Sequence, residues 1–174
     1  HKPDRRQRQM CIRDSPVAAA EIATKARRSL GVGFIGLAHY LAKNNVKYSD
    51  PEALSLVHDI TEAFQYYLLK SSSEIAKEKG ACSGFKNTKY SNGIFPIDTY
   101  KKDVDELVPN NLKYDWNSLR NHVQEFGLRH STLSAQMPSE SSSVVSNATN
   151  GIEPPRGFLS ICLLYTSPSP RDLY

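Results

Sequence analysis

Apolar residues recur with a helical period in several stretches of this 174-residue chain and alternate as in a strand in one. The longest helical pattern covers residues 51–79. Ser49 or Asp50 can cap it, and Pro51 suits its first turn. Gly80 stands where a helix commonly ends. The positions predicted to form its buried stripe are Leu54, Val57, Ile60, Ala63, Phe64, Tyr67 and Leu68.

Helices and turns alternate along the rest of the chain. Asn44 ends a helix that begins near Ile35, and another helix runs from about Asp115 to Gly127. A serine-rich turn separates the strand-like stretch from the last helical piece, an order typical of α/β architecture. The predicted elements are helices over 16–29, 35–43 and 114–126, a turn-rich loop at 84–100, a helical piece at 103–109, a strand at 130–137 and a short helix or turn at 142–151.

The two ends of the chain do not resemble parts of one fold. A DNA sequence that encodes residues 10–15 can also encode residues 162–167 when its reverse complement is translated. Such a pair is typical of a sequencing adapter translated by mistake. We therefore expect residues 1–15 and 162–174 to be artefactual and disordered. Residues 16–161 are then expected to be an internal fragment of a longer protein.

Excluding these ends changes the charge and cysteine arguments. The net charge of the whole chain is +4, residues 1–15 hold five cations against two acids, and Arg171 and Asp172 cancel. The remaining charge of about +1 gives no indication of nucleic-acid binding. Only Cys82 is left, so neither a disulfide framework nor a cysteine pair for a metal is predicted. No apolar run is long enough to span a membrane, and a reducing cytoplasm is expected.

Three other features carry little chemistry. Gly31, Gly33 and Gly36 match G-x-G-x-x-G, but at most three strand-like residues precede them. The acid at the offset that dinucleotide binding requires, Asp50, lies at a helix cap, so close helix–strand packing, which small residues permit, is favoured instead. The histidines share no metal-ligand spacing and are predicted to be surface or core imidazoles. Cys82 is predicted to be a small buried or turn residue.

The serine-rich turn is the strongest candidate for a binding site. Pro138 is followed by Ser139, Glu140, Ser141 and Ser142 at the point where the strand passes into the helix. The first turn of a helix leaves backbone N–H groups without partners, and serines can cap them or join them in binding an anion. Glu140 opposes a phosphate unless it points away or accepts a hydrogen bond, for example from a sugar hydroxyl. The residues alone leave both capping and phosphate binding open.

Several blocks of the chain resemble one family. They are "RRSLGVGFIGLAHYLAK", "FQYYLLKSS", "GIFPIDTYKKDVD", "YDWNSLR" and "GLRHSTLSAQMPSESSSVVSNATNGIEPPRG", of which the last is the most specific. Together they resemble the large (alpha, catalytic) subunit of class I ribonucleoside-diphosphate reductase over residues 16–161. The resemblance implies a helix-rich part of the second half of a ten-stranded α/β barrel. It also implies that Pro138, Ser139, Glu140, Ser141 and Ser142 hold the substrate diphosphate.

The resemblance further implies the chemistry of the whole enzyme. The family reduces ribonucleoside diphosphates to 2′-deoxyribonucleoside diphosphates by a thiyl-radical mechanism. The radical arrives from a diiron-tyrosyl cofactor in a small (beta) subunit, and the large subunit forms a homodimer. Thioredoxin or glutaredoxin supplies the electrons. ATP and deoxynucleoside triphosphates act as allosteric effectors at sites outside this segment.

Much of the family's machinery has no counterpart in this sequence. The radical cysteine, the reducible cysteine pair, the acid/base partners and the relay tyrosines are not matched, so no catalytic residue, metal ligand or bound cofactor is assigned here. The isolated chain is predicted to be inactive and only marginally foldable, because half a barrel leaves strand edges open. Two alternatives remain: a fragment of a cobalamin-dependent reductase with the same barrel, and a non-enzymatic α/β module whose serines cap a helix.

Overall fold

The chain divides into two compact units in the computed structural model, which describes residues 17–106 and 112–154. Unit 1 contains residues 17–33 and 50–136, and unit 2 contains residues 34–49 and 137–154, within those described ranges. The predictions for residues 1–16, for the end of the 103–109 helical piece and for residues 155–174 lie outside the described residues.

The predicted helices form close to their expected limits, because their start and stop signals act locally. Unit 1 contains most of them, and unit 2 contains α3 and α7. The α-helices are α2 (Ala18–Arg27), α3 (Leu37–Lys43), α4 (Pro51–Lys79), α5 (Pro96–Thr99), α6 (Trp116–Phe126) and α7 (Glu140–Ser146). Short 3₁₀ helices are η1 (Ser83–Asn87), η2 (Lys89–Asn92) and η3 (Lys102–Glu106).

The predicted cap positions are confirmed at the two best-defined helices, although the Asp50 side chain makes no capping hydrogen bond. Asp50 precedes α4, with Pro51 as its first residue, and Gly80 ends it with a φ of 79°. At α6, the Asp115 carboxylate accepts a hydrogen bond from the Ser118 N–H at 2.9 Å. Gly127 ends α6 with a φ of 74°, and a Cβ at this position would lie only 2.7 Å from the Ala81 Cβ. Glycine is therefore required at Gly127 by both conformation and space.

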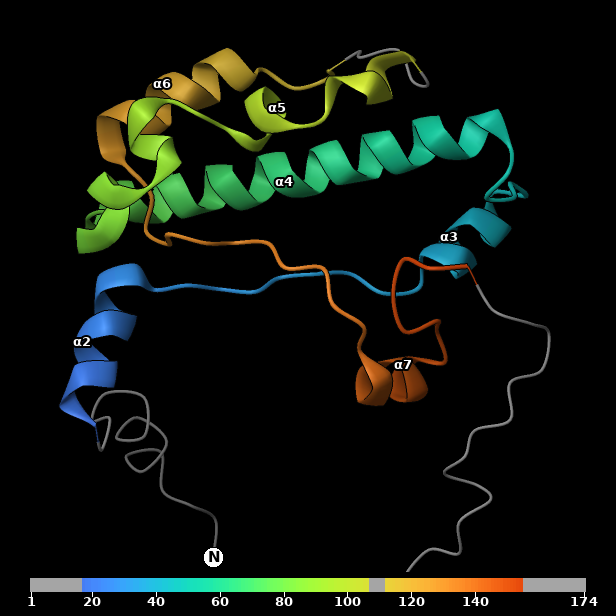
Figure 1. Ribbon diagram of the computed structural model, residues 1–174, viewed down its shortest axis with the longest axis horizontal. Coiled ribbons are helices and arrows are strands. Elements are labelled where there is room, and N and C mark those ends of the chain that lie inside the picture. The colour runs from blue at the N-terminus through green and yellow to red at the C-terminus, as the bar shows by residue number, and fades with distance from the viewer. Residues whose placement is uncertain (1–16, 107–111, 155–174) are drawn as a thin grey trace, which may run out of the picture. The chain divides into compact units, whose positions relative to one another are not determined.

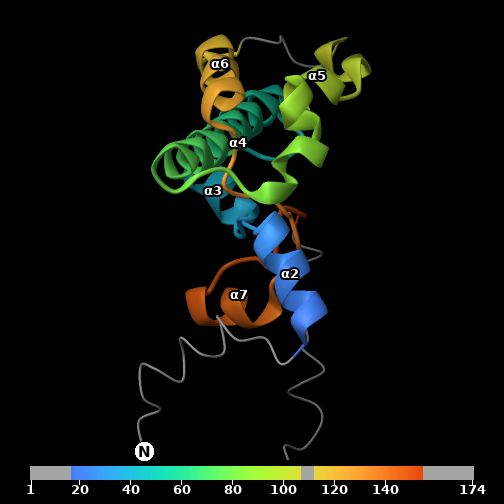
Figure 2. The ribbon, with the colours of Figure 1, turned by 90° about the vertical axis from the view of Figure 1, so that its left-hand side faces the viewer.

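The core of unit 1 lies between α4, α6 and the loop that carries α5. Figure 1 shows α6 and the α5 segment along one side of α4, and the rotated view in Figure 2 keeps both beside it. The amphipathic helix α6 turns Trp116, Leu119 and Val123 inward at spacings of three and four residues. The buried cluster is Leu69, Phe95, Trp116, Leu119, Val123, Leu128 and Leu133.

The predicted apolar stripe of α4 is wrong in part, because three of the six residues that this helix buries are polar. Leu54 and Tyr67 are 42% and 52% exposed. The residues that α4 buries are Ala53, Glu62, Leu69, Ser72, Ser73 and Ala76. Each buried polar group on this face has found a partner, which hydropathy along the helix cannot predict.

Glu62 supplies the main polar contact of this face and is only 6% exposed. Its carboxylate accepts hydrogen bonds from the Lys113 N–H at 2.9 and 3.0 Å, from the Tyr114 N–H at 3.2 Å and from the Trp116 Nε1–H at 2.9 Å. The carboxylate therefore ties the segment that enters α6 onto the middle of α4.

The two buried serines of α4 pair with histidines. Ser72 Oγ lies 3.0 Å from His130 Nδ1, and Ser73 Oγ lies 2.8 Å from His122 Nδ1 and donates to the Gly127 carbonyl at 3.0 Å. Both histidines are half-buried and take part in side-chain packing, within the prediction of surface or core imidazoles. Burial, together with the nearby Arg129 and Arg28, lowers the pKa of His130.

The predicted strand at 130–137 is an extended segment that forms one isolated parallel bridge, between Val32 and Ser134. The Leu30 N–H donates to the Thr132 carbonyl and the Val32 N–H to the Leu133 carbonyl, each at 2.9 Å. The described residues contain no strand, so the expected sheet is not formed within them. Each of these segments has only the other as its partner there, whereas parallel sheets are built from strands paired on both sides.

Gly33 explains the glycine motif near this pair of segments. A Cβ at Gly33 would lie 2.4 Å from the Ala135 carbonyl oxygen, closer than any side chain permits. The predicted close packing is therefore found at Gly33, but between two extended segments and not between a helix and a strand. No helix in the described part of the chain is both long and apolar enough to cross a bilayer.

We expect Glu62→Ala to lower the free energy of unfolding by about 3 kcal/mol, because one buried and two partly buried N–H groups lose their acceptor. Trp116 is the only tryptophan of the 174-residue chain, so its fluorescence during urea unfolding measures this change directly. The control is Glu74→Ala at an exposed position of the same helix, with an expected change below about 0.5 kcal/mol. Equal effects of the two substitutions would contradict the role given to Glu62.

We expect His130 to make the chain less stable in mild acid. Because its pKa is lowered in the folded state, the unfolded chain binds more protons once the pH falls below the ordinary value of about 6.5. Its stabilising contribution is complete above that pH and is lost as the pH decreases. The urea midpoint should therefore fall between about pH 7.5 and pH 5.5, and fall less in His130→Gln; identical slopes would refute this.

Candidate functional site

The candidate site is the turn that leads into α7, and the structure brings all five predicted residues together there. Ser139 is the cap residue, with φ −129° and ψ 86°, and the helix begins at Glu140. Pro138, Glu140, Ser141 and Ser142 are exposed, and Ser139 is half-buried. The turn is therefore open to solvent within unit 2.

The segment that follows α7 returns and holds the turn in place. Asn147 ends the helix in the left-handed conformation with a φ of 50°. The Ala148 N–H then donates to the Ser143 carbonyl at 3.0 Å, and the Ser139 N–H donates to the Asn150 carbonyl at 2.8 Å. Both ends of α7 are thus tied to residues 147–150, a contribution that the sequence analysis missed; the Asn-Ala-Thr-Asn-Gly run was its available signal.

The same returning segment is joined to the start of α3. The Gly36 N–H donates to the Thr149 carbonyl at 3.0 Å, and the Gly36 φ is 76°. The Tyr48 hydroxyl, from the segment after α3, donates to the Ile152 carbonyl at 3.0 Å. Unit 2 therefore frames the candidate turn with backbone contacts that are far apart in the sequence.

The serines of this region divide into two groups by what their hydroxyls contact. The Ser143 hydroxyl donates to the Glu140 carbonyl at 2.6 Å, and the Ser146 hydroxyl donates to the Ser142 carbonyl at 2.7 Å. These two serines satisfy the helix itself. The hydroxyls of Ser139, Ser141 and Ser142 have no hydrogen-bond partner among the described residues.

The backbone N–H groups at the start of α7 also divide into those with an acceptor and those without one. The Ser143 N–H donates to the Ser139 carbonyl at 3.1 Å, and the Ser139 N–H is bonded to Asn150. The N–H groups of Glu140, Ser141 and Ser142 have no acceptor among the described residues. One exposed turn therefore carries three backbone donors and three hydroxyls without partners among the described residues, at a helix end where the dipole favours negative charge.

The alternative in which the serines merely cap the helix is not what the structure shows. Ser139 occupies the cap position but makes no side-chain capping hydrogen bond. The Glu140 carboxylate is exposed in the first turn, where it also faces the positive end of the helix dipole.

The remaining chemical candidates of the sequence lie away from this turn in the chain. Cys82 is buried, its N–H donates to the Leu128 carbonyl at 3.0 Å, and burial raises the pKa of its thiol. A raised pKa keeps the thiol protonated and weakly nucleophilic, consistent with the predicted structural role. Residues 17–106 and 112–154 contain no group of three or more His, Cys, Asp or Glu side chains that could hold a metal ion.

We expect Asn147→Val to loosen α7 and its turn. A β-branched residue is strained in the left-handed conformation of Asn147, at a cost of about 1 kcal/mol or more, whereas glycine adopts it freely. Hydrogen–deuterium exchange of residues 139–150 should therefore quicken in Asn147→Val and stay unchanged or slow in Asn147→Gly. Equal exchange in the two variants would show that this conformation does not hold the turn.

Comparison with known proteins identifies relatives of this chain. The profile of the family described as "Ribonucleotide reductase, barrel domain" matches residues 7–161. The match begins inside the 1–15 segment and ends at residue 161, and the prediction that both ends are artefactual stays a prediction.

Individual relatives are similar over most of the chain. A ribonucleoside-diphosphate reductase subunit alpha of Haemophilus influenzae is 63% identical over 148 residues, which are 85% of this chain and 20% of that protein. The reductase 1 subunit alpha of Escherichia coli is 57% identical over 148 residues, 85% of this chain and 19% of that protein. The subunit alpha of Enterobacteria phage T4 is 49% identical over 146 residues, 84% of this chain and 19% of that protein. The chain thus spans about a fifth of the length of the curated relatives it matches.

Proposed function

The chain belongs to the ribonucleotide reductase barrel-domain family, and we propose that the full-length protein reduces ribonucleoside diphosphates to 2′-deoxyribonucleoside diphosphates. In this proposal, the turn at residues 138–142 holds the substrate diphosphate. The observation that carries the assignment is the set of three N–H groups and three hydroxyls without partners at the start of α7. The names of the relatives support the reaction.

Each residue of the turn has a separate task in this proposal. Ser141 and Ser142 offer both an N–H and a hydroxyl, and Glu140 offers its N–H. Ser139 offers only its hydroxyl, because its N–H is bonded to Asn150. Pro138 has no N–H and instead fixes the backbone that enters the turn. A diphosphate spreads its negative charge over several oxygens, so it can accept from several of these donors at once.

The Glu140 carboxylate needs a role that does not oppose the phosphate. We assign it as an acceptor for a hydroxyl of the substrate or of a neighbouring residue, as its exposure permits. A carboxylate in the first turn is also stabilised by the helix dipole, which offsets part of its repulsion of the diphosphate.

The redox chemistry is assigned to groups that this chain does not contain. In the proposal, a thiyl radical on a cysteine of the full-length subunit activates the ribose. A cysteine pair supplies two electrons and two protons and becomes a disulfide, so that a hydrogen replaces the 2′-hydroxyl, which leaves as water. No catalytic residue is assigned to residues 16–161, and the isolated chain is expected to be inactive. The extended pair near Val32 and Ser134 is proposed to belong to the second half of a ten-stranded barrel.

The partners follow from the same proposal. They are a small subunit that generates the radical with a diiron-tyrosyl cofactor, a second large subunit, and thioredoxin or glutaredoxin as reductant. ATP and deoxynucleoside triphosphates are proposed as effectors that bind outside this chain, and the cytoplasm is proposed as the location. The alternative is a cobalamin-dependent source of the radical. The two sources differ in whether the reduction requires a small subunit that generates the radical.

We expect Glu140→Pro to weaken diphosphate binding relative to Glu140→Ala. Both variants lose the carboxylate, but only proline removes the N–H, and proline is tolerated as the first residue of a helix. The N–H of Glu140 has no internal acceptor, so its loss breaks no contact within the described structure. Loss of one hydrogen bond to a charged group should raise the Kd of a ribonucleoside diphosphate by about tenfold or more.

The measurement is titration calorimetry of a ribonucleoside diphosphate with the full-length subunit. Equal Kd values for Glu140→Pro and Glu140→Ala would exclude this N–H from the site. Exchange rates of residues 139–150 in both variants serve as the check that α7 is intact.

A further inference from the structure

A second region of the chain has the features of a binding site. Unit 1 contains a cavity of about 430 Å³, within the size range of small-molecule sites. Its walls are the last turn of α2, the loop from Gly84 to Thr99, and Ser131 with Thr132 on the extended segment. None of the lining residues belongs to the turn at 138–142.

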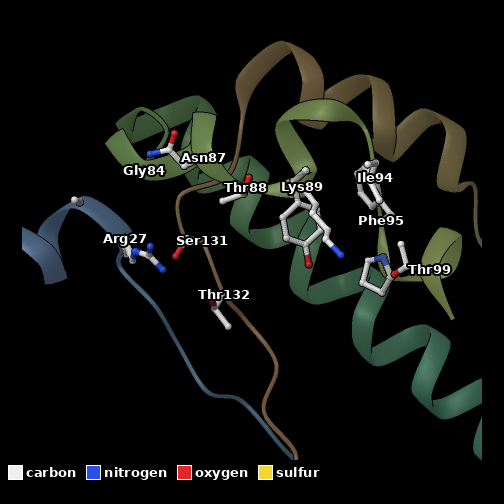
Figure 3. A pocket seen from close by; sticks show the side chains of 13 residues that line it. Arg27, Gly84, Asn87, Thr88, Lys89, Ile94, Phe95, Thr99, Ser131 and Thr132 are labelled. Atoms are coloured by element: carbon white, nitrogen blue, oxygen red, sulfur yellow. The ribbon is translucent and has the colours of Figure 1, made fainter.

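The cavity is lined by two cations and no acid. Figure 3 shows Arg27 entering from α2 and Lys89 from the opposite wall, with Ser131 and Thr132 on the segment between them. Neither cation has an ion-pair or hydrogen-bond partner for its side chain among the described residues. The positive charge at this cavity is therefore not neutralised within the described structure.

The acid closest to the cavity in sequence is already paired. Asp98 is the only acid between residues 82 and 100, and its carboxylate accepts from Arg120 at 2.8 and 3.0 Å. It also accepts from the Phe95 N–H at 2.8 Å. Because Asp98 is held in this way, it is not free to swing toward Arg27 or Lys89.

The cavity is also lined by neutral side chains that can donate hydrogen bonds and make none within the described residues. The side chains of Asn87, Thr99 and Thr132 and the hydroxyl of Tyr90 line it and have no partner among the described residues. Tyr90 is half-buried and its hydroxyl makes no hydrogen bond among the described residues, so this hydroxyl is a donor available to a ligand.

The remaining wall is apolar and aromatic. Ile94, Phe95 and Pro96 line it together with the Tyr90 ring, and the Tyr90 and Phe95 rings meet edge to face with centroids 5.5 Å apart. Gln124 donates to the Tyr90 carbonyl at 2.7 Å, and the Arg120 guanidinium lies 4.9 Å from the centre of the Phe95 ring. Contacts from α6 therefore fix this wall before any ligand arrives.

We propose that this cavity binds a phosphate monoester carried on a planar apolar body. Arg27 and Lys89 contact the phosphate from two sides, and the hydroxyls of Thr132 and Tyr90 donate to its remaining oxygens. The planar body packs against the wall formed by Ile94, Pro96 and the Tyr90 ring, which the buried Phe95 supports edge to face. The cations provide the affinity for the charge, and the aromatic wall separates this class of ligand from inorganic phosphate.

The test uses the full-length subunit and titration calorimetry with phenyl phosphate, compared with inorganic phosphate and with phenol. Lys89→Ala and Arg27→Ala remove side chains that have no partner within the described structure, so both are expected to fold as the parent does. We expect each to weaken phenyl phosphate binding by about tenfold or more. The matched control is Lys86→Ala, an exposed cation of the same loop that does not line the cavity, with unchanged affinity.

The comparison of probes completes the test. Inorganic phosphate should bind more weakly than phenyl phosphate, and phenol should show no sensitivity to Lys89→Ala. The proposal would be overturned if phenyl phosphate did not bind. This includes the case in which other parts of the full-length subunit occupy the cavity. Equal losses in Lys86→Ala and Lys89→Ala would also overturn it, because the effect would then reflect general surface charge.

Discussion

The buried carboxylate of Glu62 is the contact on which unit 1 depends. A charge in the interior is costly unless it is fully hydrogen-bonded, and here the N–H groups of Lys113, Tyr114 and Trp116 meet that requirement. The carboxylate thereby fixes where α6 begins. Trp116 then packs near Phe95, with ring centroids 6.5 Å apart, so the position of α6 determines that of the loop that lines the cavity.

The serines of unit 2 have two different roles. Some stabilise helix α7, and others belong to the candidate turn. Ser143 and Ser146 return their hydroxyls to carbonyls of α7, as serines inside helices commonly do. Ser139, Ser141 and Ser142 keep theirs available, although Ser139 occupies the position from which a side chain usually caps. The turn is held instead by the backbone of residues 147–150, and the cap side chain makes no hydrogen bond of its own.

The extended segments of unit 1 show why a strand pattern is not sufficient for a sheet. Residues 30–33 and 131–136 run parallel, and Gly33 allows the two backbones to approach. They form one bridge because each lacks a second neighbour within the described residues. Family membership implies a barrel, in which every strand is paired on both edges, and this pair is consistent with two neighbouring strands of such a barrel.

The sequence by itself determined the features that depend on neighbours along the chain. Pro51 and Gly80 bound α4, Asp115 and Gly127 bound α6, and the motif around Ser139 marked the candidate turn. Tertiary structure decided the rest, because partners distant in sequence carry no local signal. Only the fold pairs Glu62 with the segment entering α6, joins Ser139 to Asn150, and brings Arg27 and Lys89 to one cavity. A hydrophobic pattern counts Glu62 as polar and therefore exposed, whereas its three donors make burial favourable.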